Sequence, residues 1–344
     1  MTITAGLDVG GAHLKVARVD GGKTVAVRQI ACPLWQGLDK LDAALAEAHP
    51  LIAGAARHAV TMTGELSDLF PDRKTGVETL VARLEREFGP ATRFWMGTRG
   101  FGDAAAARHN YADVGSTNFL ATAALIGERV ADALLIDFGS TTADIIPIRG
   151  GRPIPRGLTD PDRLATGELV YTGFTRTPVM GVTTRATFKG RSQTLAREYL
   201  ATMADVRRIL GTLPDGIDQH ATADGRGKTV EESVARFARM FGRDAADGTL
   251  EDWRTAAEGI REAQLASILD GCREVLAAAP LSIEAPVVAA GIGAEEVEEI
   301  SKSLMRSCIA FGDLAGVGET CRLEATRAAP AVAVALLVAS HPVP

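Results

Sequence analysis

The amino-acid sequence predicts an α/β protein of two duplicated lobes with a cleft between them. The first observation is an internal repeat, because LDVGGAH at residues 7–13 matches IDFGSTT at residues 136–142. The second is that strand-like and helix-like segments alternate along both halves, which is typical of a mixed sheet covered by helices. Four identities share an offset of 129 residues and favour duplication: Asp8 with Asp137, Gly10 with Gly139, Gly21 with Gly150, and Gly22 with Gly151.

The first half is interpreted as a three-stranded hairpin unit followed by alternating helices and strands. Gly21-Gly22 suits a tight turn between the second and third strands. We assign residues 1–130 to the first lobe. The strands are expected at 3–8, 13–19, 24–30, 59–62 and 93–96, and the helices near 38–48, 75–88 and 117–128.

The second lobe is assigned to residues 131–325, with an insertion at about 157–230. Residues 157–191 are rich in Thr, Gly and Pro and are expected to form strands and loops, and the polar segment 214–228 is expected to be a surface loop. The last helix, about 326–340, is nearly all apolar, so we expect it to be buried and to cross back to the first lobe. Other helices are expected at 193–210, 229–241, 250–278 and 294–307, with a buried strand at 285–290.

Composition excludes several classes of protein. The 344 residues are 46% hydrophobic and 23% charged, which argues against disorder, and the net charge of −6 gives no basic surface for nucleic acid. The N-terminus has no signal-peptide pattern, and no stretch reaches the ~20 apolar residues of a membrane span. None of the four cysteines forms a C-x-x-C pair. We therefore expect a cytoplasmic protein without nucleic-acid or membrane partners and without a zinc or disulfide framework.

The two glycine turns are predicted to bind phosphate. A strand that ends in Asp and turns at Gly brings bare backbone against a ligand, so that N–H groups reach phosphate oxygens. Asp8 and Asp137 end equivalent strands and suit a Mg²⁺ ion that keeps most of its waters. The predicted phosphate- and substrate-binding residues are Gly10, Gly11, His13, Gly139, Ser140, Thr141, Thr142, Gly291, Gly293 and Arg176, with the Lys15 ammonium beside the first turn.

These turns resemble the phosphate motifs of the actin, sugar kinase and Hsp70 superfamily. Asp8-Val-Gly10 with Lys15 is similar to its first motif, and residues 137–144 are similar to its second. The segment Ala290-Gly291-Ile-Gly293 is similar to the third, which holds a nucleoside in that superfamily. The resemblance implies a duplicated actin-like, ribonuclease H-like ATPase fold with a ligand gripped between the two lobes.

Within that superfamily the chain resembles the hydantoinase/oxoprolinase-like branch. More narrowly, it resembles the tetrahydromethanopterin-linked C1-transfer pathway protein family, which is related to the synthase of the aminomethylfuran–tyramine ether of methanofuran. The segments that carry this resemblance are TMTGEL at 61–66, RKTGV at 73–77, GSTNF at 115–119, ATGELVYTG at 165–173, RTPV at 176–179 and TADG at 222–225.

The resemblance implies a transferase that alkylates the phenol oxygen of a (glutamyl-)tyramine or tyrosine derivative. The donor is an aminomethylfuran-methyl diphosphate, and inorganic diphosphate leaves. A Mg²⁺ ion at Asp8 and Asp137 is implied, and residues 157–191 with Tyr171, Phe174 and Arg176 are expected to form a lid. The residues assigned to catalysis are Lys15, Asp8, Asp137, Asp144 and Glu168, and the base for the phenol proton is left open among Glu65, Asp144, Glu168 and His220.

Two other functions stay open at this point. One is an ATP-dependent kinase or hydantoinase/oxoprolinase-type ATPase, and the other is a non-catalytic actin-like sensor. Residues 116–121 lack the Asp that sugar kinases use there, and Ala290-Gly291 stands where nucleotide binders often have paired glycines. ATP is therefore not expected as a cofactor, whereas diphosphate and phenolic substrates are. The oligomeric state, including a homo-oligomer, is left open.

Overall fold

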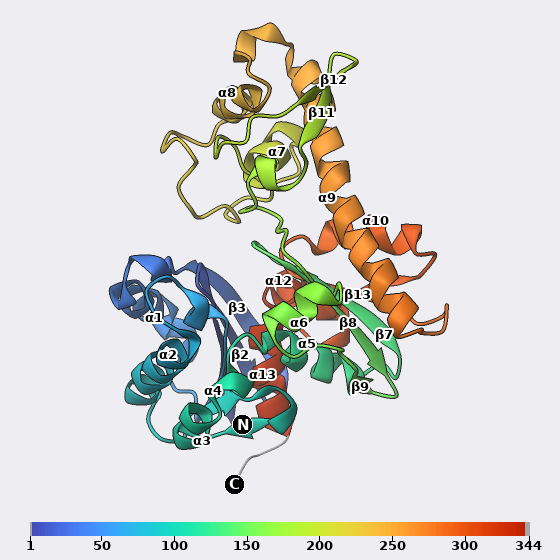
Figure 1. Ribbon diagram of the computed structural model, residues 1–344. Helices are drawn as coiled ribbons and strands as arrows, with labels where there is room; N and C mark the ends of the chain where they lie inside the picture. The colour runs from blue at the N-terminus through green and yellow to red at the C-terminus, as the bar shows by residue number, and fades with distance from the viewer. Residues whose placement is uncertain (1, 341–344) are drawn as a thin grey trace.

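The computed structural model describes residues 2–340 and contains two lobes, each built on its own sheet, with a helical third lobe above them (Figure 1). The first sheet has the order β3-β2-β1-β4-β5-β6. Its central strand β1 runs antiparallel to β2 and parallel to β4. The strands are β1 (Ile3–Val9), β2 (His13–Asp20), β3 (Lys23–Ala31), β4 (Arg57–Met62), β5 (Arg93–Trp95) and β6 (Phe101–Gly102).

Helices cover the first sheet. Asp72 caps the start of α2, because its carboxylate accepts the Thr75 amide N–H at 2.7 Å. Apolar residues of α1 and α2, such as Leu41 and Leu80, pack in one core with Leu7 of β1. The helices are α1 (Leu38–Ile52), α2 (Arg73–Phe88), α3 (Ala104–His109), α4 (Tyr111–Val114) and α5 (Asn118–Gly127).

The second sheet repeats the centre of the first. Its order is β10-β8-β7-β13-β14, with β9 paired to β8. Strand β7 runs antiparallel to β8 and parallel to β13, as β1 does with β2 and β4. The strands are β7 (Ala133–Phe138), β8 (Ala143–Arg149), β9 (Arg152–Pro153), β10 (Leu169–Val170), β13 (Val287–Ala290) and β14 (Cys308–Ala310).

Helix α13 (Ala329–Ser340) lies between the two sheets (Figure 1). Its side chains share one apolar core with α5 and with residues of β2 and β8, such as Val19 and Ile146. The expected helix 326–340 starts later, because the chain bends by 112° between the segments Glu319–Arg327 and Ala329–Ser340. Among residues 2–340 no single helix could cross a membrane by length and apolarity; only those two bent segments, taken together, meet the criterion.

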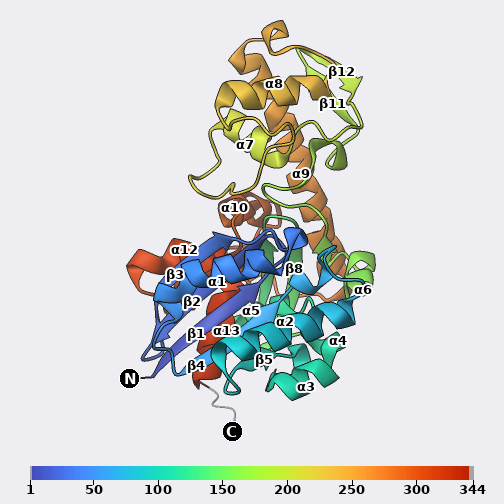
Figure 2. The ribbon, with the colours of Figure 1, turned by 90° about the vertical axis from the view of Figure 1, so that its left-hand side faces the viewer.

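The third lobe stands on the long helix α9 (Leu250–Ala278), which continues down onto the second sheet (Figure 2). The Trp253 ring of α9 stacks on Phe188 with centroids 4.3 Å apart. The apolar cluster of this lobe extends from Val179 to Ile260, past the expected insertion limits of 157–230. Its other elements are β11 (Arg185–Phe188), β12 (Arg191–Thr194), α7 (Met203–Leu210) and α8 (Val230–Met240).

Two of the expected helices are wrong in extent. Residues 191–194 form strand β12 against β11, and α7 starts only at Met203. The helix starts there because Thr202 and Asp205 form a capping box. Helix α10 (Ala294–Ser303) ends before the expected residue 307, because Met305 adopts a left-handed φ of 56° ahead of β14.

Gly6 of β1 lies directly against α13. A Cβ at this position would lie 2.1 Å from the Ala331 carbonyl oxygen and 2.7 Å from the Ala335 Cβ. We expect Gly6→Ala to lower the free energy of unfolding by ~1–3 kcal/mol, because the helix must move away from the strand. Denaturant unfolding measures this change.

The matched control is Gly259→Ala in α9, where a Cβ meets no atom within 4 Å. That variant should be neutral or more stable, because Ala favours the helix. Equal stability of Gly6→Ala and the wild type would show that α13 does not constrain β1.

Candidate active site

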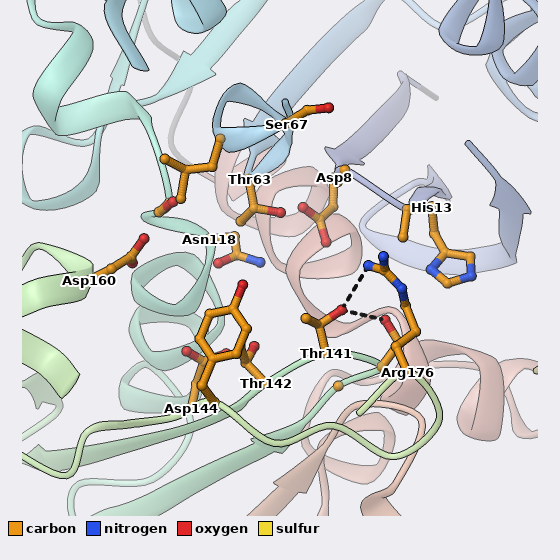
Figure 3. Close-up of a pocket in the computed structure, with 18 of the residues that line it drawn as sticks. Asp8, His13, Thr63, Ser67, Asn118, Thr141, Thr142, Asp144, Asp160 and Arg176 are labelled. Atoms are coloured by element: carbon orange, nitrogen blue, oxygen red, sulfur yellow. Dashed lines mark hydrogen bonds between the residues drawn. The ribbon is translucent and has the colours of Figure 1, made fainter. Parts of the chain in front are cut away.

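A cavity of about 410 Å³ lies between the two duplicated hairpins. Figure 3 shows Asp8 and His13 on one side of it and Thr141, Thr142 and Asp144 on the other. The two turns that the sequence singled out therefore meet at one cavity. The lining includes the predicted residues Asp8, Gly10, Gly11, His13, Lys15, Asp137, Gly139, Ser140, Thr141, Thr142, Asp144 and Arg176.

The two turns close in the same way. The Gly10 amide donates to the His13 carbonyl oxygen at 3.0 Å, and the Gly139 amide donates to the Thr142 carbonyl oxygen at 2.9 Å. Both amides are thus used inside the turns, which corrects their expected role as phosphate donors. The amides that follow them, of Gly11 and Ser140, are the ones that could meet an anion in the cavity.

The strand register places charged residues opposite each other in both hairpins. Asp8 faces Lys15, whose Nζ lies 3.5 Å from Asp8 Oδ2. In the second hairpin Asp137 faces Asp144. Asp144 occupies the position in the second repeat that Lys15 occupies in the first. The second hairpin therefore has two facing acids in place of an acid and a base, and Asp144 needs a cation from elsewhere in the chain.

Arg163 of α6 (Asp160–Ala165) supplies that countercharge. Its guanidinium forms an ion pair with Asp144, donates to the Glu168 carbonyl oxygen at 3.2 Å, and lies 3.6 Å from the centre of the Phe119 ring. The side chain is almost fully buried and lines the cavity. The sequence analysis did not select Arg163; the one signal for it was the acid that stands at the repeat position of Lys15.

Burial sets the protonation of the facing carboxyls. Burial raises the pKa of Asp8, while the ammonium of Lys15 opposes this shift. Burial raises the pKa of Asp137 to about 7; Lys15 lowers it, and Asp144 and Asp8 raise it further. Among the described residues, the buried Asp8 Oδ1 has no hydrogen-bond partner. Burying a charged or unpaired carboxylate oxygen costs free energy, and a proton or a cation bound at these carboxylates would reduce that cost.

The donor set fits a magnesium ion with few protein ligands. No cluster of three or more His, Cys, Asp or Glu side chains within residues 2–340 is placed to hold a metal. Mg²⁺ is commonly bound by one or two carboxylates together with water and substrate phosphates. Asp8, with an unpartnered oxygen, and Asp137 match that description, and the metal itself stays a prediction.

Glu168 lies outside the cavity lining. It is fully buried, and its carboxylate accepts the amides of Arg156 at 2.6 Å and Gly157 at 2.9 Å. The Thr166 hydroxyl donates to it at 3.2 Å. Since both oxygens are engaged, Glu168 holds the loop before α6, which corrects its expected place among the catalytic residues.

Gly291 and Gly293 lie behind the second hairpin. A Cβ on Gly291 would stand 2.4 Å from the Phe138 carbonyl oxygen, and one on Gly293 would stand 2.4 Å from the Phe138 ring. The Gly293 amide donates to that same carbonyl at 2.9 Å. Neither glycine lines the cavity, so their expected contact with ligand is replaced by tight packing of β13 and α10 against β7.

The expected lid divides into buried and exposed parts. Phe174 is buried and packs edge-on against Phe138, so it belongs to the core. Tyr171 is 68% exposed and lines the cavity. Arg176 donates to Thr141 Oγ1 at 3.2 Å, as Figure 3 shows.

The remaining base candidate near the first lobe, Glu65, also lies outside the lining. Its Oε1 accepts the Ser116 hydroxyl at 2.7 Å, and burial raises its pKa to about 7. Ser116 lines the cavity with a left-handed φ of 55°. Further lining residues that no sequence pattern had assigned to the site include Trp35, Thr63 and Asn118.

A second cavity of about 600 Å³ adjoins the first and shares Trp35 and Arg176 with it. His220, the last of the base candidates, lines this second cavity. Its neighbours Asp218 and Asp224 are held by Arg208 and Arg236, with N–O distances of 2.6 and 3.0 Å. These ion pairs fix the loop that carries His220.

Comparison with known proteins adds a family to this geometry. A family model described as Hydantoinase/oxoprolinase matches residues 57–318. A curated relative from Methanocaldococcus jannaschii is 33% identical over 240 residues, which are 70% of this chain and 71% of the relative. It is named (4-{4-[2-(gamma-L-glutamylamino)ethyl]phenoxymethyl}furan-2-yl)methanamine synthase. A relative from Methanococcus vannielii with the same name is 27% identical over 176 residues, which are 51% of this chain and 78% of the relative.

A solved structure of nucleotide-free acetone carboxylase superposes with a TM-score of 0.58 at 11% identity, over 96% of this chain and 70% of that chain. At this identity the likeness shows the fold alone. Together with the repeated sheet topology, it agrees with the duplicated actin-like fold expected from the sequence.

The raised pKa of Asp137 predicts a loss of stability with rising pH. The folded state holds this proton up to about pH 7, whereas the unfolded carboxyl releases it near its ordinary value of 3.8. The stabilisation from protonation is full below that ordinary value and is lost as the pH rises through 7. Between pH 5 and 8 we expect the free energy of unfolding of the wild type to fall by ~2 kcal/mol relative to that of Asp137→Asn, which has no carboxyl to titrate at this position.

Urea unfolding of the ligand-free protein at the two pH values measures this difference. Asp270→Asn, on an exposed part of α9, is the matched control and should follow the wild type. Parallel pH curves for Asp137→Asn and the wild type would contradict the buried, protonated carboxyl.

Proposed function

The chain belongs to the hydantoinase/oxoprolinase family, and from this premise we propose that it is a transferase of methanofuran or methylofuran biosynthesis. In this proposal an aminomethylfuran-methyl diphosphate alkylates the phenol oxygen of a glutamyl-tyramine, a tyramine or a tyrosine derivative. The names of the two relatives support it, because their product contains a phenoxymethyl link between a phenol and a furan. The observation that carries it is the single cavity at which both phosphate-type hairpins meet.

The proposed step is a substitution at the furan methylene carbon. A lone pair of the phenol oxygen forms the new C–O bond, and the bond from the same carbon to the diphosphate oxygen breaks. Diphosphate leaves with that electron pair, and the phenol proton passes to a base. The enzyme must therefore stabilise negative charge on the leaving group as it develops, since only such interactions lower the barrier.

Cationic groups of the cavity suit this task. Lys15 and Arg176 enter it from opposite lobes, and both line it. Gly11 and Ser140, at the tips of the two turns, line the same cavity, and their amides would add donors there. All four are held by hairpins or by the Thr141 contact, so they need no rearrangement as charge develops.

The charge balance of the cavity supports an added cation. Three cationic side chains, Lys15, Arg163 and Arg176, stand beside five acidic residues, Asp8, Asp68, Asp137, Asp144 and Asp160; burial keeps Asp137 protonated to about pH 7, and Asp160 also pairs with Arg73. These charges nearly balance, so the negative charge of a bound diphosphate would need a further positive charge beside it. A Mg²⁺ ion bound at Asp8 and Asp137 would supply charge neutralisation of the leaving group.

The ATP-dependent alternative needs a nucleoside site. In the superfamily that the sequence resembles, the third glycine turn provides it, and here that turn packs against Phe138 outside the cavity lining. This placement favours a small diphosphate ligand over a nucleotide. Cytoplasmic location stays a prediction, and the oligomeric state stays open.

Lys15→Ala tests the charge that the leaving group requires. We expect kcat for diphosphate release to fall by about 10²-fold or more, because a preorganised positive charge is lost where negative charge develops. Lys15→Arg should retain part of the activity. The measurement is diphosphate released from the furan diphosphate and glutamyl-tyramine in the presence of Mg²⁺, with calorimetric binding of inorganic diphosphate as a second readout.

Lys302→Ala is the matched control, because Lys302 is exposed on α10 and pairs with exposed Glu298 at 2.8 Å. Wild-type rates and diphosphate affinity in folded Lys15→Ala would exclude the proposed cleft. Turnover of ATP to ADP by the wild type, with no diphosphate release, would support the ATP-dependent alternative instead.

A further inference from the structure

The second cavity lies between the first lobe and the third lobe. One wall comes from the end of β3 and the short turn Leu34–Gln36, and the other comes from the loops on either side of α7. The loop after α7 contacts the first lobe directly, because Gln219 Nε2 donates to the Gln29 carbonyl oxygen at 3.4 Å. The cavity is therefore built by segments from two lobes.

Aromatic and cationic side chains mark the boundary between the two cavities. Trp35 and Tyr199 are 38% and 50% exposed, although both are large and largely apolar. The Arg176 guanidinium lies 5.1 Å from the centre of the Trp35 ring. Flat aromatic surfaces beside a cation, in a cavity of about 600 Å³, suit an aryl ligand of modest size.

Two imidazoles meet at the same boundary. The His13 and His220 rings pack edge to face with centroids 4.7 Å apart, and the His220 ring lies 5.5 Å from Trp35. His13 lines the first cavity and His220 the second. Among the described residues, neither buried Nε2 atom has a hydrogen-bond partner. Buried polar atoms usually have one, so these nitrogens indicate a polar ligand at the junction.

The surroundings keep both imidazoles neutral. Burial lowers the pKa of His220 to about 4; Arg176 and Lys228 lower it further, and Asp218 opposes them. Burial also lowers the pKa of His13, with His220, Lys15 and Arg176 acting in the same direction. Near pH 7 each ring is therefore neutral and carries a free nitrogen lone pair, and the cations that lower the pKa would be offset by an anionic diphosphate bound beside Arg176.

The other base candidates have different partners. Glu168 holds two backbone amides, and Asp144 pairs with Arg163. Glu65 accepts the Ser116 hydroxyl and lines neither cavity. His220 is the candidate that lines a cavity and whose buried Nε2 has no partner among the described residues.

We propose that the second cavity binds the phenolic acceptor and that His220 Nε2 accepts the phenol proton as the ether bond forms. This inference rests on the proposed function, in which the furan diphosphate occupies the first cavity. The acceptor ring lies against Trp35, and its oxygen reaches the methylene carbon at the junction where Trp35 and Arg176 line both cavities. The proton moves from the phenol oxygen to Nε2, and the electron pair of the broken C–O bond leaves with diphosphate.

His220→Ala tests the proton transfer. A phenol has an ordinary pKa of ~10 and needs a base near neutral pH, so we expect kcat at pH 7 to fall by about 10²-fold or more. The affinity for inorganic diphosphate should not change. The rate of the variant should rise roughly tenfold per pH unit between 7 and 9 as the free phenolate takes over, and added imidazole should restore part of the rate at pH 7.

His109→Ala, at the exposed end of α3, is the matched control. A wild-type rate and pH profile in His220→Ala would overturn the assignment of the base while leaving the proposed function intact. Absence of ether formation by the wild-type protein would instead be a failure of the proposed function.

Trp35→Ala tests the acceptor cavity without any turnover. We expect tyramine, titrated calorimetrically into the protein without donor, to bind the wild type and to bind Trp35→Ala at least about tenfold more weakly, because a stacking surface is lost. Inorganic diphosphate should still bind both proteins, with a smaller change in affinity than tyramine shows, because Trp35 also borders the first cavity. Absence of tyramine binding by the wild type, or equal binding by both proteins, would overturn the acceptor cavity whether or not the proposed function holds.

Discussion

The shared apolar core beneath the two sheets is the constraint on which the site depends. Helix α13 contacts β1 so closely that Gly6 has no room for a Cβ, and the same core reaches Ile146 of the second sheet. Because this packing fixes both sheets against one helix, the strand ends that carry Asp8 and Asp137 are held at a common cavity. Without that common core, each hairpin would be an ordinary turn.

Duplication produced two hairpins of equal shape and unequal charge. In the first, Asp8 faces Lys15 across the strands, and in the second, Asp137 faces Asp144. Arg163 of α6 restores part of the balance by pairing with Asp144. Burial raises the pKa of Asp137, and the neighbouring carboxyls of Asp144 and Asp8 raise it further, so a cation beside these groups would favour their charged forms.

The third lobe adds a second cavity to the one between the two duplicated hairpins. Helix α9 carries it from the second sheet, and the loop around His220 returns to contact Trp35 and His13 of the first lobe. The second cavity thus exists only because three segments distant in the chain converge. In the proposed substitution, two adjoining cavities would hold the two substrates next to each other.

The sequence by itself determined the two hairpins and their helices, because strand alternation, glycine turns and helix caps are local properties. Residues 250–278, for example, form the helix that their periodicity predicted. Local preference failed at 193–210, where pairing with β11 and the capping box at Thr202 divide the segment. Only the tertiary structure decided that Glu168 holds a loop, that Arg163 meets Asp144 and that His220 lies at a junction of cavities. Those contacts join segments that are distant in the chain. Packing and burial determine which residues meet, and local sequence patterns do not predict this.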